Sequence, residues 1–499
     1  MLAQTSEFIA PSIDWWALTP QMILVGAALV IMLVTSLSPV KIPGWVSTLI
    51  TVAAATAAGV VAWWLWNDVL DEGASSTVAG AFGVDGFSLF FTILTVIAVA
   101  ATALVGDAYV EREGMSGPEF HALLLTTATG AIVMAAANDL IVLFIGLESL
   151  SIGLYVLAAM QFRRATAQEA AMKYFVLGAF ASAFFLYGIA LVYGATGTTN
   201  LATLSTFFDS LGSRTADLEL LLIGTALLLT GLAFKIAVAP FHFWAPDVYQ
   251  GSPSPVTGYM ASAAKAAGIA ALLRIFFAAL GPLAADWSTP IAVGSAITII
   301  VGAVMAITQN DVKRMLAFSS VGHAGYILVG IQAATDDGTS SALFYMFTYS
   351  LMVIGSFAVV SALRGGADHD IEKYKGLAQR RPLLAAAFTV FLLGQAGVPF
   401  TSGFVAKFMV IRAAVSDEVY WLAILAMVAS VITAFMYLRI IMTMWDREAD
   451  VDGAPSISVP WTTGVVVLAT AVATIAYGVI PQSLIEFARD AVPVLVAAG

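Results

Sequence analysis

Long apolar runs, interrupted by short polar segments, extend along almost the whole chain. A helix needs roughly 20 residues to cross about 30 Å of hydrocarbon. By that length criterion the sequence predicts about fourteen transmembrane helices, and therefore an all-α polytopic membrane protein. Their expected ranges are 21–38, 46–66, 86–106, 120–138, 139–160, 171–194, 218–239, 255–280, 290–309, 313–333, 341–363, 383–412, 419–445 and 461–481.

The composition fits a protein whose solvent is the bilayer. Of 499 residues, 60% are hydrophobic and 11% are charged, with a mean hydropathy of +0.93. Soluble domains usually carry about 25% charged residues. The net charge of −11 does not suggest a nucleic-acid partner, and no glycine-rich phosphate loop indicates ATP hydrolysis. No basic segment precedes the first apolar run, so we expect no cleaved signal peptide.

The chain contains no cysteine and four histidines. Iron–sulfur clusters held by thiolates, thiolate zinc sites and disulfides are therefore excluded. No two histidines stand at metal-ligand spacing within one expected helix. A haem held by two histidines would need them to converge from distant helices. We expect no redox centre, metal or other cofactor in this chain.

Basic residues are divided unevenly between the two sets of loops. Loops after odd-numbered helices hold twelve lysines and arginines, whereas the other loops and the tails hold only Arg214 and Arg489. Because loops rich in Lys and Arg stay in the cytoplasm, both termini are expected outside. The twelve are Lys41, Arg112, Arg163, Arg164, Lys313, Arg314, Arg364, Lys373, Lys375, Arg380, Arg381 and Arg447.

Two expected spans contain helix breakers beside a lysine. The seventh reads TGLAFKIAVAPFHFW, where Pro240 follows Lys235, and the twelfth reads GQAGVPFTSGFVAK, where Pro399 precedes Lys407. Proline removes a helix hydrogen bond and clashes with the preceding turn, so both spans should be broken. Since their places in the chain differ by five helices, the two spans run in opposite directions, as inverted five-helix repeats would require.

This pattern predicts three parts. An N-terminal segment of three helices covers 1–119, and a C-terminal helix and tail cover 446–499. The core between them, 120–445, holds two inverted repeats, helices 4–8 at about 120–280 and helices 9–13 at about 290–445.

Four lysines fall inside apolar spans: Lys173, Lys235, Lys265 and Lys407. A lysine at the centre of a membrane helix costs about 2.5–3.5 kcal/mol, so such residues are usually functional or paired. Burial favours the neutral form of an amine, and a lysine that gains and loses a proton easily suits a proton relay. Lys173 lies near a span end, where reaching toward water is the alternative. Arg274 lies nearer a helix end and is interpreted as an interfacial anchor.

Glu148 and His323 are the other candidates within spans. A lone buried carboxylate would take up a proton unless a cation stood close, so a partnership with Lys173 or Lys235 is expected. His323 lies among serines and could bridge a proton wire between Lys265 and Lys407. A structural, hydrogen-bonded histidine is the alternative. His242, Asp247 and Tyr249, in the connection after the seventh span, either lie near a proton access route or only shape that loop.

Three long segments resemble the antiporter-like membrane subunits of respiratory complex I. They are FKIAVAPFHFWAPDVYQGSPSPVTGYMASAAKAAG, NDVKRMLAFSSVGHAGYILVG and GVPFTSGFVAKFMV. The resemblance is strong from about residue 140 to 439. Within the family, AAMKYFVLGAFASAFFLYGIALVYGATGT is similar to subunits of the N type, as is the lysine at 407, where the M type usually has glutamate.

The resemblance implies proton translocation coupled to NADH:quinone electron transfer. It implies a central charged axis of Glu148, Lys235, Lys265 and Lys407, with Lys173 as a further position. It also implies that NADH, FMN, iron–sulfur clusters and quinone sit in partner subunits, with subunits K and M as neighbours in a bacterial cell membrane. The rivals are a subunit of an Mrp-type cation/proton antiporter, a hydrogenase-linked pump, and a membrane scaffold without transport.

Overall fold

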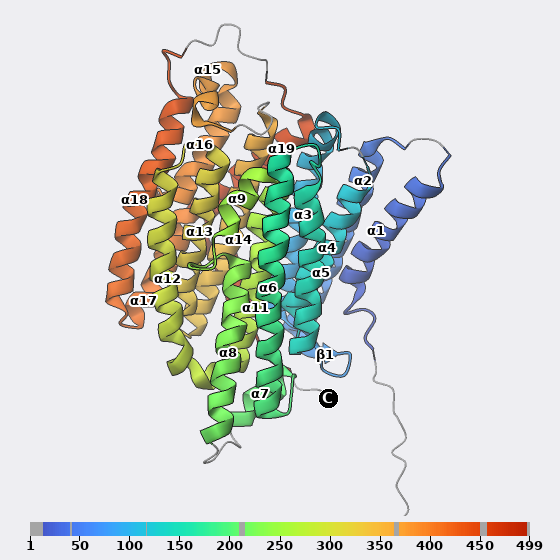
Figure 1. Cartoon of the computed structure of the whole chain (residues 1–499), viewed down its shortest axis with the longest axis vertical. Helices are drawn as coiled ribbons and strands as arrows, with labels where there is room; N and C mark the ends of the chain where they lie inside the picture. Colours follow the sequence, from blue (N-terminus) through green and yellow to red (C-terminus); the bar gives the residue numbers. More distant parts are fainter. Residues whose placement is uncertain are drawn as a thin grey trace, which may run out of the picture.

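The chain forms a bundle of helices that run roughly along one axis (Figure 1). The computed structural model describes residues 13–39, 42–115, 117–208, 215–363, 369–449 and 457–496. Both chain ends lie outside these residues. So do Lys41, Arg214 and Arg364, three of the basic loop residues counted for the orientation. The predicted all-α polytopic architecture is confirmed.

The helices have the following bounds. The first group comprises α1 Thr19–Leu37, α2 Gly44–Glu72, α3 Gly86–Arg112, α4 Glu119–Ala136, α5 Leu140–Ala159, α6 Ala165–Thr196, α7 Leu201–Phe207, α8 Thr215–Ile236, α9 Trp244–Gly251, α10 Ser254–Tyr259 and α11 Lys265–Leu272. The second comprises α12 Ala284–Ile307, α13 Val312–Ile331, α14 Asp336–Ala362, α15 Leu377–Arg380, α16 Pro382–Ala396, α17 Ser402–Ser416, α18 Tyr420–Met444, α19 Trp461–Val479 and α20 Gln482–Asp490.

Among the described residues, twelve helical segments are long and apolar enough to cross a membrane. α13 coincides with the expected span 313–333, and the shorter pair α16 and α17 together cover the expected span 383–412. The count of fourteen spans and the inverted repeats therefore stay predictions. Both expected breaks are present: α8 ends at Ile236, and residues 397–401 separate α16 from α17.

The span that carries Lys265 is irregular in a way the sequence did not reveal. Within 254–279, two π-helical segments, Met260–Ala264 and Leu273–Ala279, flank α11. The first ends directly before Lys265. π-helical turns are uncommon and are often found at functional sites, because the wider turn re-aims the side chains that follow it.

A short β-hairpin, also not predicted, connects α2 to α3. Strand β1, Ser75–Thr77, pairs antiparallel with β2, Phe82–Val84. The hairpin and the C-terminal end of the described chain lie at the same end of the bundle as α7 (Figure 1). There, the side chain of Asn138 donates to the carbonyl groups of Gly80 and Val496, both at 2.8 Å.

The interpretation of Arg274 as an interfacial anchor is wrong. Its side chain is fully buried and donates to both carboxylate oxygens of Asp85, at 2.6 and 2.8 Å, and to the carbonyl oxygens of Ala135 and Val494. Asp85 also caps α3 through the backbone of Ser88. The pair joins four distant segments, and losing one partner of such a buried pair typically costs about 3–5 kcal/mol.

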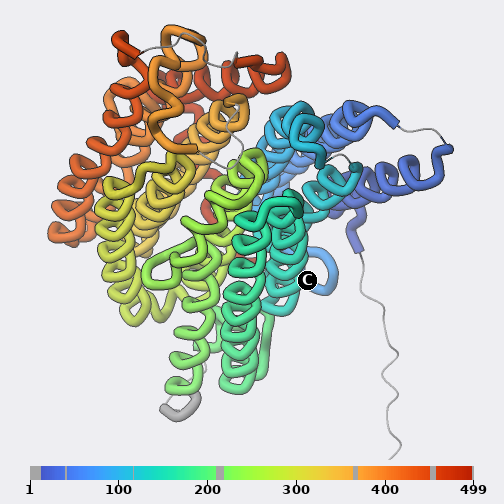
Figure 2. The backbone as a smooth tube through the Cα atoms, turned by 45° about the horizontal axis from the view of Figure 1, so that its top comes forward, coloured from blue at the N-terminus to red at the C-terminus, as the bar shows by residue number. Residues whose placement is uncertain are grey.

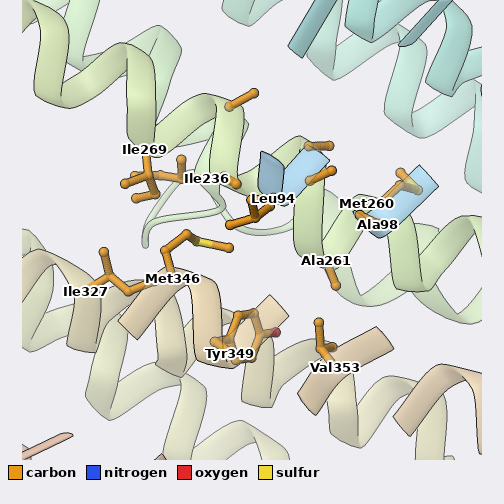
Figure 3. Close-up of a cluster of buried hydrophobic side chains, with 14 of the residues drawn as sticks. Leu94, Ala98, Ile236, Met260, Ala261, Ile269, Ile327, Met346, Tyr349 and Val353 are labelled. Carbon is orange, nitrogen blue, oxygen red and sulfur yellow. The ribbon is translucent and has the colours of Figure 1, made fainter. Parts of the chain in front are cut away.

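Apolar side chains from α3, the Lys265 span, α13 and α14 meet at the centre of the molecule. Figure 3 shows Leu94, Met260, Ile269, Ile327 and Met346 facing one another there. The tube in Figure 2 shows the helices of the first half beside those of the second half around this centre. Small residues allow close approach: a Cβ on Gly302 of α12 would lie 2.5 Å from the backbone nitrogen of Gly322 of α13.

Candidate functional site

The break after α8 leaves backbone groups that other segments satisfy. Ala237 adopts a left-handed conformation that turns the chain away from the helix axis. The indole of Trp244 donates to the carbonyl oxygen of Phe234 at 2.9 Å, and the Ala239 N–H donates to the hydroxyl of Thr298 at 3.0 Å. Because a membrane interior offers no water to an unpaired carbonyl, such partners are what allow a break inside a bundle.

Lys235 lies in the last turn of α8, one residue before this break. Its side chain is buried, and its ammonium donates to the hydroxyl of Ser151 on α5 at 2.8 Å. The helix macrodipole favours a cation at this carbonyl end. The lysine stem packs against Gly268, where an added Cβ would lie 3.2 Å from the Lys235 Cγ. Gly268 thus brings Lys235 within one helical turn of Lys265.

Glu148 forms no direct ion pair with either of its two expected partners, Lys173 and Lys235. Within the described chain its carboxylate has no ion pair, and its Oε1 atom is buried without a hydrogen-bond partner. It acts on Lys235 electrostatically without touching it, and Ser151, one turn along α5, occupies the contact position instead. A cavity of 10 Å³ lined by Ser151, Tyr155 and Lys235 lies beside these groups, and this is about the smallest volume that holds one water molecule.

Lys265 is the most enclosed of the three axis lysines. Only 2% of the residue is exposed, and its ammonium donates to both the backbone oxygen and the hydroxyl of Ser320 on α13, at 2.7 and 2.6 Å. Among the described residues no acidic side chain pairs with it. The π-helical segment therefore comes directly before an amine that is bonded to a hydroxyl group in a buried, close-packed region.

His323 lies one turn further along α13, between Lys265 and Lys407, and both ammonium groups act on it electrostatically. Its Nδ1 atom lies 2.8 Å from the hydroxyl of Tyr345 and its Nε2 atom 3.1 Å from the hydroxyl of Tyr437. Tyr437 also bonds the hydroxyl of Ser319. The imidazole thus connects the hydroxyls of Tyr345 and Tyr437, and through Tyr437 that of Ser319, an arrangement that suits a proton bridge and equally a structural, hydrogen-bonded histidine.

Lys407 follows the second break, in α17. Its ammonium donates to the carbonyl oxygen of Ala396, the last residue of α16, and to the hydroxyl of Ser430 on α18, both at 2.9 Å. It also lies 4.8 Å from the centre of the Tyr326 ring, an arrangement that stabilises a cation. Its stem packs against Gly397, whose φ of +87° favours glycine.

Lys173 lies apart from these lysines, and of the two partners expected for Glu148 it is Lys235 on which the carboxylate acts. Its side chain is 42% exposed and pairs with Glu169 at 2.7 Å and Asp247 at 2.6 Å. Arg314 binds the other oxygen of Asp247. Burial alone would raise the pKa of Asp247, but the hydrogen bonds from Lys173 and Arg314 outweigh that effect and lower it. These four residues form a charged cluster at the end of the bundle that also carries Arg163 and Arg164, which we call the basic end.

Sequence reasoning missed one buried lysine. Lys313 counted as a loop residue, yet it lies in the first turn of α13 and is only 2% exposed. Its ammonium donates to the carbonyl oxygen of Ser252, the residue directly after α9. No local signal could have revealed this, because a Lys-Arg pair at a helix start reads as a solvated end and the covering segment is 61 residues away.

The described residues contain no group of three or more His, Asp or Glu side chains placed to hold a metal ion. The chemistry they do offer is proton transfer. Amine, hydroxyl, imidazole and phenol groups alternate through the centre of the bundle, and each can accept a proton on one side and release one on the other.

Comparison with known proteins identifies the family. A family model described as "NADH:quinone oxidoreductase/Mrp antiporter, TM" matches residues 137–433. The chain belongs to this family. It is 42% identical over 539 residues to NADH-quinone oxidoreductase subunit N of Rhodococcus opacus strain B4, with 98% of each chain covered. It is 40% identical over 480 residues to the protein of the same name from Trichlorobacter lovleyi, covering 95% of this chain and 96% of that one.

A solved structure shows the same fold. The chain superimposes on a chain of respiratory complex I from Thermus thermophilus with a TM-score of 0.79 and 32% identity, covering 96% of this chain and 100% of the other. The region matched by the NADH:quinone oxidoreductase/Mrp antiporter family model contains all six candidate residues: Glu148, Lys173, Lys235, Lys265, His323 and Lys407.

Proposed function

We propose that this chain is the proton-translocating membrane subunit of an NADH:quinone oxidoreductase. The observation that carries the proposal is the row of three buried lysines, Lys235, Lys265 and Lys407, each bonded to a serine hydroxyl on another helix. Each lysine carries an insertion cost of about 2.5–3.5 kcal/mol, which a scaffold without transport has no reason to bear. Family membership and the names of its relatives support the same function.

Protons pass along this row in the proposed mechanism. Lys235 and Lys265 exchange protons in this mechanism, since the Lys235 stem packs against Gly268, three residues after Lys265, and Glu148 favours the charged state of Lys235 from a distance. Ser320, Ser319, Tyr437 and His323 continue the row toward Lys407. Lys173 lies at the basic end, where its cluster with Asp247 conducts protons toward the row.

The orientation and the partners follow from this proposal. The basic end, with Arg163, Arg164 and Lys173, faces the cytoplasm because Lys and Arg are retained there, and both termini face the outside of the cell membrane. Other membrane subunits, among them subunits K and M, flank the chain. The two inverted repeats, at about 120–280 and 290–445, supply one lysine beside a broken helix each.

This chain is proposed to carry no cofactor of its own. NADH, FMN, iron–sulfur clusters and quinone belong to partner subunits, and the chain takes part in the enzyme as its proton pump. The absence of cysteine from the sequence rules out thiolate ligation of a cluster here.

The test is Lys235→Ala in the intact complex, reconstituted into vesicles. We expect NADH-driven proton translocation and quinone reduction to fall together by about a hundredfold, the scale of losing one positioned acid–base group. Lys375→Ala is the matched control, because Lys375 is an exposed lysine outside the row, paired with Asp446.

Normal pumping by an assembled Lys235→Ala complex would overturn the proposal. The composition of the purified complex separates the rivals. Flavin and iron–sulfur absorbance that copurifies with the chain supports the oxidoreductase, whereas a colourless complex with cation-dependent proton exchange supports the Mrp-type antiporter.

A further inference from the structure

Lys313 is a buried amine that the row of central residues does not include. It lies in the first turn of α13, where the helix macrodipole disfavours a positive charge. Within the described residues it forms no ion pair, and the carbonyl oxygen of Ser252 is its hydrogen-bond acceptor. The charged groups that act on it do so from a distance: Asp311, Glu113 and Arg164. Such an amine releases a proton more easily than a solvated one.

Two of the charged groups that act on Lys313, Glu113 and Arg164, line a cavity at the basic end. The cavity has a volume of 210 Å³ and is lined by Glu113, Gln161 and Arg164, among others. Gln161 donates to the buried hydroxyl of Tyr109 at 3.1 Å, and Tyr109 lies beside the backbone of Ser254. Polar groups therefore lead from the cavity to the turn that covers Lys313.

Unpaired hydroxyl groups continue from Lys313 toward the centre. The side chains of Ser252, Ser254 and Tyr249 are at most 1% exposed, and their hydroxyls have no hydrogen-bond partner among the described residues. Native proteins rarely bury several such groups together, and ordered water usually bridges them where they occur. They are the groups that a chain of proton transfers needs.

The inner end of this row reaches Lys265. Ser320 lies seven residues after Lys313 on the same face of α13, about 10.5 Å along the helix axis. The Ser320 hydroxyl accepts the bond from Lys265, and the hydroxyl of Tyr249 approaches it without completing a hydrogen bond. The neighbouring Arg314 pairs with Asp247 and belongs to the charged cluster around Lys173.

We propose that Lys313 is a further proton-carrying residue, which takes protons from the cavity at Glu113 and Arg164 and passes them through the hydroxyls of Ser252, Ser254 and Tyr249 to Ser320 and Lys265. The proposal rests on the proposed function. In each step the neutral Nζ accepts a proton from water in the cavity, and the ammonium then gives one to the hydroxyl row. No electron is transferred.

The test compares Lys313→Met, Lys313→Arg and Lys313→His in the complete complex in vesicles, with Lys375→Met as the control. Lys313→Met is expected to lower proton translocation and coupled quinone reduction at least about tenfold. Lys313→Arg keeps the charge but cannot release the proton, so it should be equally slow. Lys313→His restores a titrating group and should recover part of the rate, with an optimum shifted to lower pH.

A purely structural cation gives the opposite ranking, because arginine would rescue better than histidine. That ranking, or a Lys313→Met complex as active as Lys375→Met, overturns the role of Lys313. If the Met variant does not assemble, the Arg and His variants decide. If Lys235→Ala stops pumping while Lys313→Met does not, the proposed function stands and only this route is wrong.

Discussion

The two broken helices, α8 and the pair α16 and α17, each hold a lysine ammonium beside the break, but with different partners. In each, a non-glycine residue in the left-handed region, Ala237 or Phe400, lies in the break, and a lysine ammonium lies near the carbonyl end of the first half-helix. Lys235 stands before its break, on that half-helix. Lys407 stands after its break and reaches back to the last carbonyl oxygen of α16.

The surroundings of the two ammonium groups differ more than their positions. Lys235 has one hydroxyl partner and the field of a carboxylate, Glu148. Lys407 has a hydroxyl, a carbonyl oxygen and the face of Tyr326, with no acidic partner among the described residues. A charge supported by a titratable carboxylate can be switched by protonating that group. A charge supported by fixed dipoles and a ring cannot. We therefore expect proton transfer to be controlled at Lys235, in the first half of the chain, and to run without such control at Lys407, in the second half.

Glu148→Gln should produce the larger of two effects that test this comparison. A carboxylate beyond contact distance stabilises an ammonium by about 1–2 kcal/mol at an effective dielectric constant near 20. Removing its charge should slow coupled proton translocation roughly tenfold, and Glu148→Asp should retain part of the rate. Steady-state pumping in vesicles across pH 6–9 measures both.

The double variant Glu148→Gln with Tyr326→Leu sharpens the same test. Because the two side chains serve different lysines, their effects on the rate should multiply. Wild-type behaviour of both Glu148 variants would show that the carboxylate is structural.

A matched pair of serine changes should give the smallest effects. Ser151→Ala removes the one hydrogen-bond acceptor that the described residues give Lys235, whereas Ser430→Ala leaves Lys407 the carbonyl oxygen of Ala396. At about 1 kcal/mol for a lost hydrogen bond, we expect about a fivefold loss for Ser151→Ala and at most about twofold for Ser430→Ala. Equal losses in pumping assays would mean that the two lysines are held in the same way.

The sequence predicted the spans and both breaks because those features depend on local pattern. Apolar length defines a membrane helix, and Pro240 and Pro399 mark interruptions wherever they occur. The lysines at 235, 265 and 407 stood out for the same reason, since a charge within an apolar run is visible without any knowledge of neighbours.

The partners of these residues could not be predicted, because they depend on how distant helices rotate and pack. Lys173 pairs with Asp247, 74 residues away. Arg274 was predicted to be an interfacial anchor because its partner, Asp85, is 189 residues away and cannot be recognised from the sequence. The π-helical segment before Lys265, Met260–Ala264, leaves the apolar pattern of the span unchanged, so the sequence did not reveal it.

The central claim is that the buried lysines carry protons and do not merely supply positive charge. Lys265→Arg tests it most directly, because arginine keeps the cation but stays protonated in proteins. In vesicles that contain the assembled complex, proton translocation driven by NADH oxidation should fall to background in this variant. Proton translocation at the wild-type rate, with normal assembly, would contradict the account.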